Sequence, residues 1–236
     1  MTEDLDLNRR YDRNRETLSP EDQALLGRAS VMVAGLGGLG GGACEMLARI
    51  GVGTLTVIDN DRFDTSNLNR QILCREDLIG TSKAAAAEDR VAAINSQIRV
   101  ISCNIFMDED NLFDLIKGHD VILDCLDAID TRFKLQDAAE TEKIPIVSGA
   151  IAGVTGQVTT IFPGDRGYEL IYGMSGRDRQ KGVEVQTGNI AHCALMTASI
   201  QVSECVKIIL NRGDLLRNRL LVAELWSNTF EVLDLI

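Results

Sequence analysis

The chain has 236 residues, a hydrophobic content of 45% and a formal net charge of −11, so it holds enough apolar material for one sizeable core. An acidic chain of this kind lacks the basic face that binding to a phosphate backbone needs, which excludes nucleic acid as a general partner. The charged N-terminus and the lack of a long uninterrupted apolar stretch favour a cytoplasmic protein with no leader peptide and no membrane span.

Residues 1–28 are predicted to form a helical arm, in which Leu5–Glu16 forms a short helix. The arm holds the basic cluster Arg9–Asn14 (RRYDRN) in an otherwise acidic chain. Ser19 is followed by Pro20 and two acidic residues, which is typical of a helix N-terminus with Ser19 as its N-cap. We expect that helix to end near Gly27.

A glycine-rich turn, Gly35–Gly40 (GLGGLG), separates the apolar run Val31–Ala34 from the amphipathic stretch Cys44–Ile50, and a second apolar run, Thr54–Ile58, ends at Asp59. This pattern predicts a strand, a turn, a helix and a second strand. Glycines let the backbone approach a phosphate, the helix N-terminus attracts negative charge, and an acid at this distance binds a ribose hydroxyl. The alternative is a tight turn that needs glycine only for packing. The candidate nucleotide-binding residues of this unit are Gly35, Gly37, Gly38, Leu39, Gly40, Asp59 and Asp61.

The segment Arg62–Ile79 is too polar and irregular for a strand, and it follows a strand end, where ligands bind in doubly wound sheets. Asn67, Arg70 and Lys83 add an amide and two cations to this region. A dinucleotide rests largely on the glycine turn and does not need them, whereas a nucleoside triphosphate needs more positive charge. The alternatives are that Arg70 is a surface charge and that Lys83 only begins a helix.

The remaining elements complete an α/β pattern. Helices are expected at Lys83–Asn95, Glu109–Gly118, Thr131–Lys143 and Ala191–Leu210, and strands at Arg99–Cys103, Val121–Asp124 and Ile146–Ser148. Further extended segments are expected at Gly156–Phe162, Gly167–Tyr172, Leu220–Trp226 and Phe230–Leu235, the last two as a hairpin. In the long C-terminal helix we expect Met196, Ile200, Val206 and Ile209 to face the sheet.

We therefore predict one domain over residues 1–236. A Rossmann-like, doubly wound and mostly parallel sheet forms the nucleotide-binding half (29–150). It continues into a mixed, partly antiparallel half (151–236), which contains a polar crossover loop at 175–188.

Six motifs occur in one order: Arg10-Tyr11-Asp12-Arg13, GLGGLG, IDND, NLNRQ, Gly80-x-x-Lys83 and Asp124-Cys125-x-Asp127. In this combination the chain resembles the ThiF/MoeB/HesA family, the bacterial relatives of ubiquitin-activating enzymes, from about Arg10 to about Leu210. The resemblance implies an adenylyltransferase that uses ATP and Mg²⁺. Its substrate would be the C-terminal Gly-Gly carboxylate of a ubiquitin-like sulfur carrier, activated as an acyl-adenylate with release of pyrophosphate.

The resemblance also implies roles for single residues. Asp59 would hold the ribose, and Asn67, Arg70 and Lys83 the phosphates. Asp127 would bind Mg²⁺, although Asp124 and Asp130 compete for that role; we expect Asp130 to be a helix cap. Arg13 would reach the triphosphate of the neighbouring subunit, which makes the active unit a homodimer. The implied catalytic set is Arg70, Lys83, Asp127 and Arg13.

Two departures from the family pattern bear on the reaction. Many relatives bind structural zinc with two C-x-x-C pairs, which this chain lacks, so we predict no zinc. The crossover loop 175–188 has no cysteine, and we expect the nearby Cys193 to be buried, so the reaction would stop at the acyl-adenylate.

Two other functions remain open at this stage. The glycine turn and Asp59 alone also fit an NAD-dependent oxidoreductase, which leaves Asn67, Arg70 and Lys83 unexplained. A family member that has lost catalysis and serves as a binding scaffold is the second alternative. The sequence leaves open which carrier or pathway is served, and whether the acceptor is instead a peptide or a small carboxylate.

Overall fold

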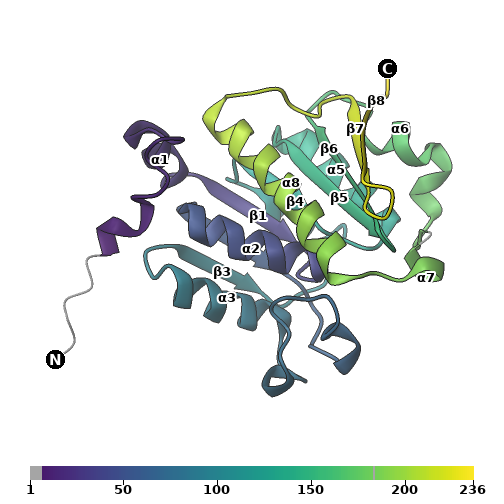
Figure 1. Ribbon diagram of the computed structural model, residues 1–236. Helices are drawn as coiled ribbons and strands as arrows, with labels where there is room; N and C mark the ends of the chain where they lie inside the picture. Colours follow the sequence, from purple (N-terminus) through teal and green to yellow (C-terminus); the bar gives the residue numbers. More distant parts are fainter. Residues whose placement is uncertain (1–6, 183) are drawn as a thin grey trace.

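The computed structural model describes residues 7–182 and 184–236, and it has the predicted α/β architecture (Figure 1). The strands are β1 (Ser30–Ala34), β2 (Thr54–Ile58), β3 (Arg99–Cys103), β4 (Val121–Asp124), β5 (Ile146–Ala152), β6 (Thr155–Ile161), β7 (Arg219–Glu224) and β8 (Thr229–Asp234). The α-helices are α1 (Pro20–Leu26), α2 (Gly38–Ile50), α3 (Lys83–Ile94), α4 (Leu112–Ile116), α5 (Ile129–Glu142), α6 (Tyr168–Tyr172), α7 (Glu184–Thr187) and α8 (Ala191–Leu210). Short 3-10 turns are η1 (Leu7–Tyr11), η2 (Thr65–Asn67), η3 (Glu76–Leu78) and η4 (Met174–Asp178).

All eight strands form one sheet in the order β3-β2-β1-β4-β5-β6-β7-β8. Strands β1 to β5 pair in parallel, whereas β6, β7 and β8 join antiparallel. The chain moves outward from β1 to β3 and then returns to the other side of β1 with β4. The order of the strands therefore reverses between β1 and β4, where doubly wound sheets bind their ligands.

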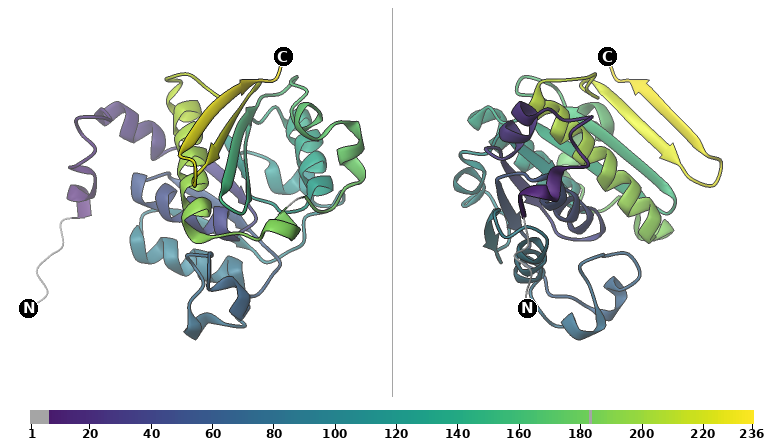
Figure 2. Two further views of the ribbon diagram at one scale, coloured as in Figure 1. Left: turned by 45° about the vertical axis from the view of Figure 1, so that its right-hand side comes forward. Right: turned by 60° about the vertical axis from the view of Figure 1, so that its left-hand side comes forward.

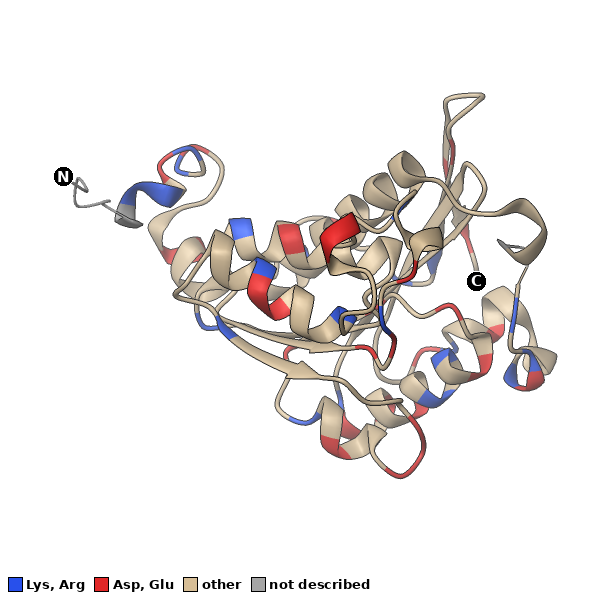
Figure 3. Cartoon of the chain, turned by 90° about the horizontal axis from the view of Figure 1, so that it is seen from below, with Lys and Arg blue, Asp and Glu red and all other residues tan. Residues whose placement is uncertain are grey.

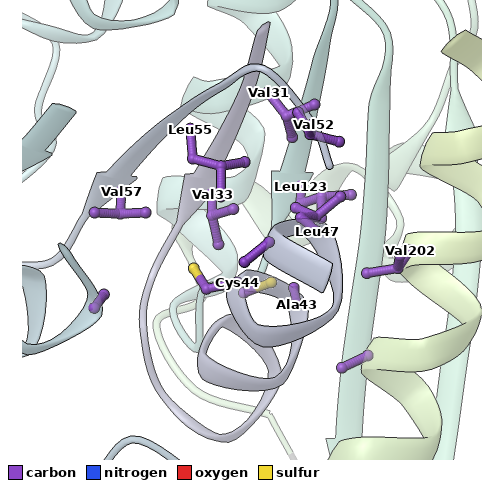
Figure 4. Close-up of a cluster of buried hydrophobic side chains, with 14 of the residues drawn as sticks. Val31, Val33, Ala43, Cys44, Leu47, Val52, Leu55, Val57, Leu123 and Val202 are labelled. Atoms are coloured by element: carbon purple, nitrogen blue, oxygen red, sulfur yellow. The ribbon is translucent and has the colours of Figure 1, made fainter. Parts of the chain in front are cut away.

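Alternate strand residues face two separate cores. On one face, Val31, Val33, Leu55 and Leu123 pack against helix α2 and its neighbours, as the close-up in Figure 4 shows. On the other face, residues such as Met32 and the rest of a second buried cluster pack under α4, α5 and α6. Burial on both faces explains why these strands read as continuous apolar runs in the sequence.

The expectations for Gly167–Tyr172 and for Asp130 were wrong. The segment Gly167–Tyr172 is not extended: Tyr168–Tyr172 forms helix α6, because Tyr168 turns into the core below α5. Asp130 is not the cap of α5. That helix begins at Ile129 with Ala128 as its N-cap, and Asp130 Oδ1 instead accepts a hydrogen bond from the N–H of Thr131.

The expected face of α8 packs on the core, but it is not the most buried one. Ile200, Val206 and Ile209 pack half-buried against the core cluster of the sheet, Met196 is also half-buried, and the buried residues form a neighbouring stripe. That stripe consists of Cys193, Ala194, Thr197, Ala198, Gln201, Val202, Glu204 and Cys205. By length and composition alone, α8 is long and apolar enough to cross a membrane. It packs here against the sheet and α2 as a core helix.

The first described element, η1, and the C-terminal hairpin of β7 and β8 lie well apart in the molecule (Figure 1 and Figure 2). The N-terminal arm stands away from the body, and its basic end is separate from the charges on the other helices (Figure 3). The expected helix in the arm is reduced to the 3-10 turn η1, and its first two expected residues lie outside the described part of the chain. Helix α1 begins as predicted, with the Ser19 hydroxyl accepting a hydrogen bond from the N–H of Asp22.

Candidate active site

A cavity of about 500 Å³ opens at the carboxyl ends of the parallel strands. Ala34 of β1 is level with Ile58 of β2 and with Asp124 of β4, so the residues that follow these three strands meet at one edge. The cavity extends from there to β5 and β6, where Ala150 to Ala152 and Gln157 line it. The predicted site residues in its wall are Gly35, Gly37, Gly38, Leu39, Asp59, Asp61, Asn67, Arg70, Lys83 and Asp127.

The glycine turn separates into two kinds of position. Gly35 has a φ of +88°, and a Cβ there would lie 2.9 Å from the carbonyl oxygen of Cys125. A Cβ on Gly40 would overlap the carbonyl oxygen of Gly35, so α2 can start this close to β1 only with glycine at position 40. Gly37 and Gly38 line the cavity itself, beside the α2 N-terminus. A Cβ on Gly37 would meet no atom nearer than 3.8 Å, so that position leaves space for a ligand, whereas a Cβ on Gly38 would lie 3.1 Å from the Cβ of Ala194.

Asp59 connects the glycine turn to the end of β2. Its Oδ2 accepts a hydrogen bond from the N–H of Leu36 at 2.7 Å, and its Oδ1 accepts one from the N–H of Asp61 at 2.8 Å. A carboxylate has about four acceptor positions. Capacity therefore remains for ligand hydroxyls, while the two backbone bonds fix the carboxylate in place.

The segment after β2 carries Asn67, Arg70 and Gln71 into the cavity wall. Asn67 is buried, and its Oδ1 accepts a hydrogen bond from the N–H of Asp64, so part of its role is to fold η2. The Arg70 guanidinium donates a hydrogen bond to the carbonyl oxygen of Ser66 at 3.0 Å. This bond helps to hold the Arg70 side chain at the cavity wall. The amide oxygen of Gln71 is buried without a hydrogen-bond donor, which is the state of a group that awaits a ligand.

Lys83 is the first residue of α3, and its side chain is only 7% exposed. Its ammonium nitrogen lies 2.8 Å from Asp61 Oδ2, and Asp61 itself is 61% exposed. A cation at a helix N-terminus opposes the helix dipole. The ion pair with Asp61 therefore offsets the unfavourable interaction between the Lys83 ammonium and the dipole of α3.

Asp127 lies three residues beyond β4, and its side chain is 75% exposed at the cavity. Its Oδ2 lies 2.6 Å from the ammonium nitrogen of Lys181, which belongs to the crossover segment (residues 175–188). Partial burial raises the pKa of Asp127, but the Lys181 ammonium outweighs burial and leaves the pKa of this carboxyl below its ordinary value. Asp127 is therefore a carboxylate near neutral pH, as a metal ligand must be.

Asp124 does not compete with Asp127 for a metal, because it is fully buried and its carboxylate is engaged. Its Oδ2 lies 3.1 Å from an Arg132 guanidinium nitrogen and accepts hydrogen bonds from Ser148 and from the Tyr168 hydroxyl. Arg132 also donates to the carbonyl oxygens of Leu126 and Gly149. This buried network fixes the loop that carries Asp127 to the neighbouring strand β5.

Cysteine chemistry finds no support in the described site. Cys193 is buried, and burial raises the pKa of its thiol, so it stays protonated. Among the described residues no group of three or more His, Cys, Asp and Glu side chains is arranged to hold a metal ion. The absence of zinc itself stays a prediction.

The structure adds three residues to the predicted site: Gln71, Arg179 and Lys181. Gln71 ends the NLNRQ motif, and its type alone did not distinguish it from a surface residue. Arg179 lines the cavity and Lys181 contacts Asp127, both from the far half of the chain. No local pattern signals them, because their place depends on the path of the crossover segment. Arg13 is exposed and is not among the cavity-lining residues.

The chain is similar to known proteins along most of its length. The profile of the ThiF family matches residues 11–235. The SAMP-activating enzyme E1 of Haloferax volcanii is 34% identical over 235 residues, which cover 98% of this chain and 87% of that protein. The molybdopterin-synthase adenylyltransferase of Salmonella typhimurium is 36% identical over 195 residues, 82% of this chain and 78% of that protein. The ThiS adenylyltransferase of Bacillus subtilis is 34% identical over 89% of this chain and 62% of that protein.

Solved structures show the same fold. A crystal structure of Escherichia coli MccB with AMPCPP and MccA has a TM-score of 0.83 at 21% identity, and covers 97% of this chain and 72% of that one. Similarity to adenylyltransferases along most of its length makes this chain an enzyme of nucleotidyl transfer. It belongs to the ThiF family.

Proposed function

We propose that the protein uses ATP and Mg²⁺ to adenylate the C-terminal Gly-Gly carboxylate of a ubiquitin-like sulfur-carrier protein. One observation carries the proposal. A single cavity brings together the glycine turn, the acid Asp59, the cations Arg70 and Lys83, and the exposed carboxylate Asp127, in a chain whose relatives are named as enzymes that activate such carriers.

In this reaction a carboxylate oxygen of the acceptor attacks the α-phosphorus of ATP. The bond from that phosphorus to the bridging oxygen breaks, so that acyl-adenylate and pyrophosphate form. Two anions must approach each other, and fixed positive charge therefore lowers the barrier. Arg70 and Lys83 supply this charge from the cavity wall, and the N-terminus of α2 adds its backbone N–H groups.

The remaining polar groups fit the nucleoside. Asp59 is fixed by two backbone bonds and has acceptor capacity left for ribose hydroxyls. The unsatisfied Gln71 oxygen needs a donor, which a ribose hydroxyl or the adenine amino group can provide. A nucleotide carries hydrogen-bond donors as well as phosphates, so it matches this wall better than a simple carboxylate ligand does.

Mg²⁺ also fits the donors present. This ion prefers oxygen ligands and usually takes one or two carboxylates together with substrate phosphates, so a site with no cage of protein ligands suits it. Asp127 would hold it, and the bound ion would neutralise charge on the phosphates. Asp124 stays outside this role, since its buried pair with Arg132 only positions the loop.

The proposal includes a homodimer in which Arg13 of one copy serves the cavity of the other. Within one chain the arm is anchored far from the cavity: the Tyr11 hydroxyl accepts a hydrogen bond from Asn95, and Gln23 donates to the carbonyl oxygen of Ile50. Ile50 ends α2, whose 13 residues begin beside the cavity at Gly38. A helix of that length spans about 20 Å, so the arm of the same chain lies at the wrong end.

The test is exchange of labelled pyrophosphate into ATP, driven by ubiquitin-like carriers that end in Gly-Gly. Wild-type protein is expected to give exchange that depends on both carrier and Mg²⁺. Asp127→Ala and Arg70→Ala are each expected to lower it by at least about a hundredfold, because each removes charge stabilisation at the reacting phosphates. Asp89→Ala is the matched control, since Asp89 is exposed on α3 and does not line the cavity.

Each of the following results would overturn a part of this proposal. Exchange that persists with carriers whose final Gly-Gly is deleted would reject the acceptor class. A lack of exchange with every carrier tested would also reject it. Tight binding of NAD without binding of ATP would favour the oxidoreductase alternative. Wild-type rates in Asp127→Ala would reject the site assignment instead.

A further inference from the structure

Lys181 contacts Asp127, but the mechanism described so far gives Lys181 no role. Its ammonium nitrogen lies 2.6 Å from Asp127 Oδ2, the carboxylate assigned to Mg²⁺. An ammonium and a divalent cation repel each other at such distances. Lys181 and the metal therefore cannot both occupy this side of Asp127, and the ammonium must find another anion when the metal binds.

The backbone around Lys181 is fixed at the cavity. Helix α5 has no side-chain cap at Ala128, and the carbonyl oxygens of Arg179 and Gln180 accept hydrogen bonds from the N–H groups of Asp130 and Ile129, at 2.9 Å and 3.1 Å. These bonds dock the crossover segment on the start of α5. Because the Lys181 side chain is 56% exposed, it can turn from Asp127 into the cavity while its backbone stays docked.

The charges in the cavity wall leave room for another cation. The described lining holds Arg70, Lys83, Arg132 and Arg179. Lys83 already faces Asp61, and Arg132 faces Asp124. A triphosphate and an acceptor carboxylate bring about five negative charges into this space, where the wall also holds the carboxylates Asp59, Asp61 and Asp127. Arg70, Lys83 and Arg179 together with one metal ion do not balance that charge, so the loaded site has a use for another cation.

We propose that Lys181 is a phosphate-binding residue of the loaded site. In the empty protein its ammonium rests on Asp127. When Mg²⁺ and the nucleotide enter, it transfers to the phosphate oxygens and becomes a cation delivered by the crossover segment. This inference rests on the proposed function and adds to it a residue from the opposite half of the chain.

The test is calorimetric titration of the full-length protein with AMPCPP, a nucleotide that cannot be cleaved by this reaction, at saturating Mg²⁺. Lys181→Met is expected to bind about tenfold more weakly than wild type, because it loses a charge-assisted hydrogen bond. Lys181→Arg is expected to stay within about threefold, because it keeps the charge. Lys117→Met is the control, since Lys117 is exposed and pairs with Asp114 outside the cavity lining.

Each outcome decides between supporting and rejecting the inference. Equal binding by wild type and Lys181→Met overturns it and leaves the proposed function intact. Tighter binding by Lys181→Met also overturns it, since Lys181 would then only compete with the metal. Equal losses in the Arg and Met variants with a lowered melting temperature assign Lys181 to folding and reject phosphate binding. Failure of wild type to bind the nucleotide overturns the proposed function and this inference together.

Discussion

Single residues explain why the glycine turn can serve both folding and ligand binding. Gly35 and Gly40 let the turn pass close to the loop after β4 and to itself, which is a packing requirement. Gly37 lines the cavity with no protein atom within 3.8 Å of where its Cβ would lie, so that space is left for a ligand; Gly38 lines the cavity too but also packs against Ala194. The two interpretations of the glycine pattern therefore apply to different glycines of one turn, and they lead to different expectations for substitution.

Gly40→Ala is expected to lower the free energy of unfolding by about 3 kcal/mol or to prevent folding, because its Cβ would overlap a backbone oxygen that cannot move aside. Gly27→Ala is the matched control. Gly27 has helical backbone angles, and the nearest atom to its Cβ would lie at 3.4 Å, so the substitution should be neutral or slightly stabilising. Urea denaturation followed by circular dichroism measures both. Equal stability of the two variants would contradict the packing role of Gly40.

At the scale of elements, α8 connects the C-terminal half to the floor of the site. Gln201 on α8 donates to the carbonyl oxygens of Asp124 and Val147, at 2.9 Å and 3.2 Å, and so contacts the ends of β4 and β5. A Cβ on Gly149 would collide with the Gln201 side chain, which accounts for glycine at that position. The polar stripe of α8 thus supports the strand end from which the Asp127 loop departs.

Gln201→Leu is expected to destabilise the fold by about 2 kcal/mol, because two buried carbonyl oxygens lose a donor while side-chain volume is nearly kept. Ser203→Ala, on the exposed side of the same helix, should change stability by less than about 0.5 kcal/mol. Thermal and urea unfolding of both variants beside wild type give the comparison. A Gln201→Leu protein as stable as Ser203→Ala would show that the two carbonyl contacts are dispensable.

Elements with strong local signals were predictable, and those defined by distant contacts were not. Buried parallel strands appear as apolar runs, and their common edge follows from the topology, so the nucleotide half and most of its site residues could be placed. Helix α6 has only five residues, and Tyr168 is held by a hydroxyl contact with Asp124 that no local pattern contains. The contact of Lys181 with Asp127 spans 54 positions and depends on the path of the crossover segment. The most buried stripe of α8 was not predicted, because it includes Gln201 and Glu204. Gln201 donates to the carbonyl oxygen of Asp124 and Glu204 accepts from the Thr160 hydroxyl, and hydrophobicity alone does not reveal these buried hydrogen bonds.

At the scale of the whole molecule, one cavity spans both halves of the sheet. The glycine turn and Asp59 belong to the parallel half, whereas Ala150 to Ala152, Gln157 and the crossover segment extend the same cavity into the antiparallel half. A nucleotide and an acceptor tail can therefore meet above the boundary between the halves. The arm with its basic cluster stays outside this arrangement (Figure 2), so its participation requires a second copy of the chain.

Subunit mixing tests this arrangement directly. Arg13→Ala and Asp127→Ala are each expected to be nearly inactive in pyrophosphate exchange as separate homodimers. If Arg13 acts on the neighbouring cavity, a mixed dimer has one cavity with both residues intact and one with neither. Random exchange of subunits at equal amounts should then restore about a quarter of wild-type activity per site. Mixing Asp127→Ala with Arg70→Ala is the control. These two residues share the cavity of one chain, so every site in that mixture lacks one of them and no activity returns. Absence of rescue in the first mixture, with subunit exchange verified by differently tagged copies, would mean that Arg13 does not act across a dimer interface.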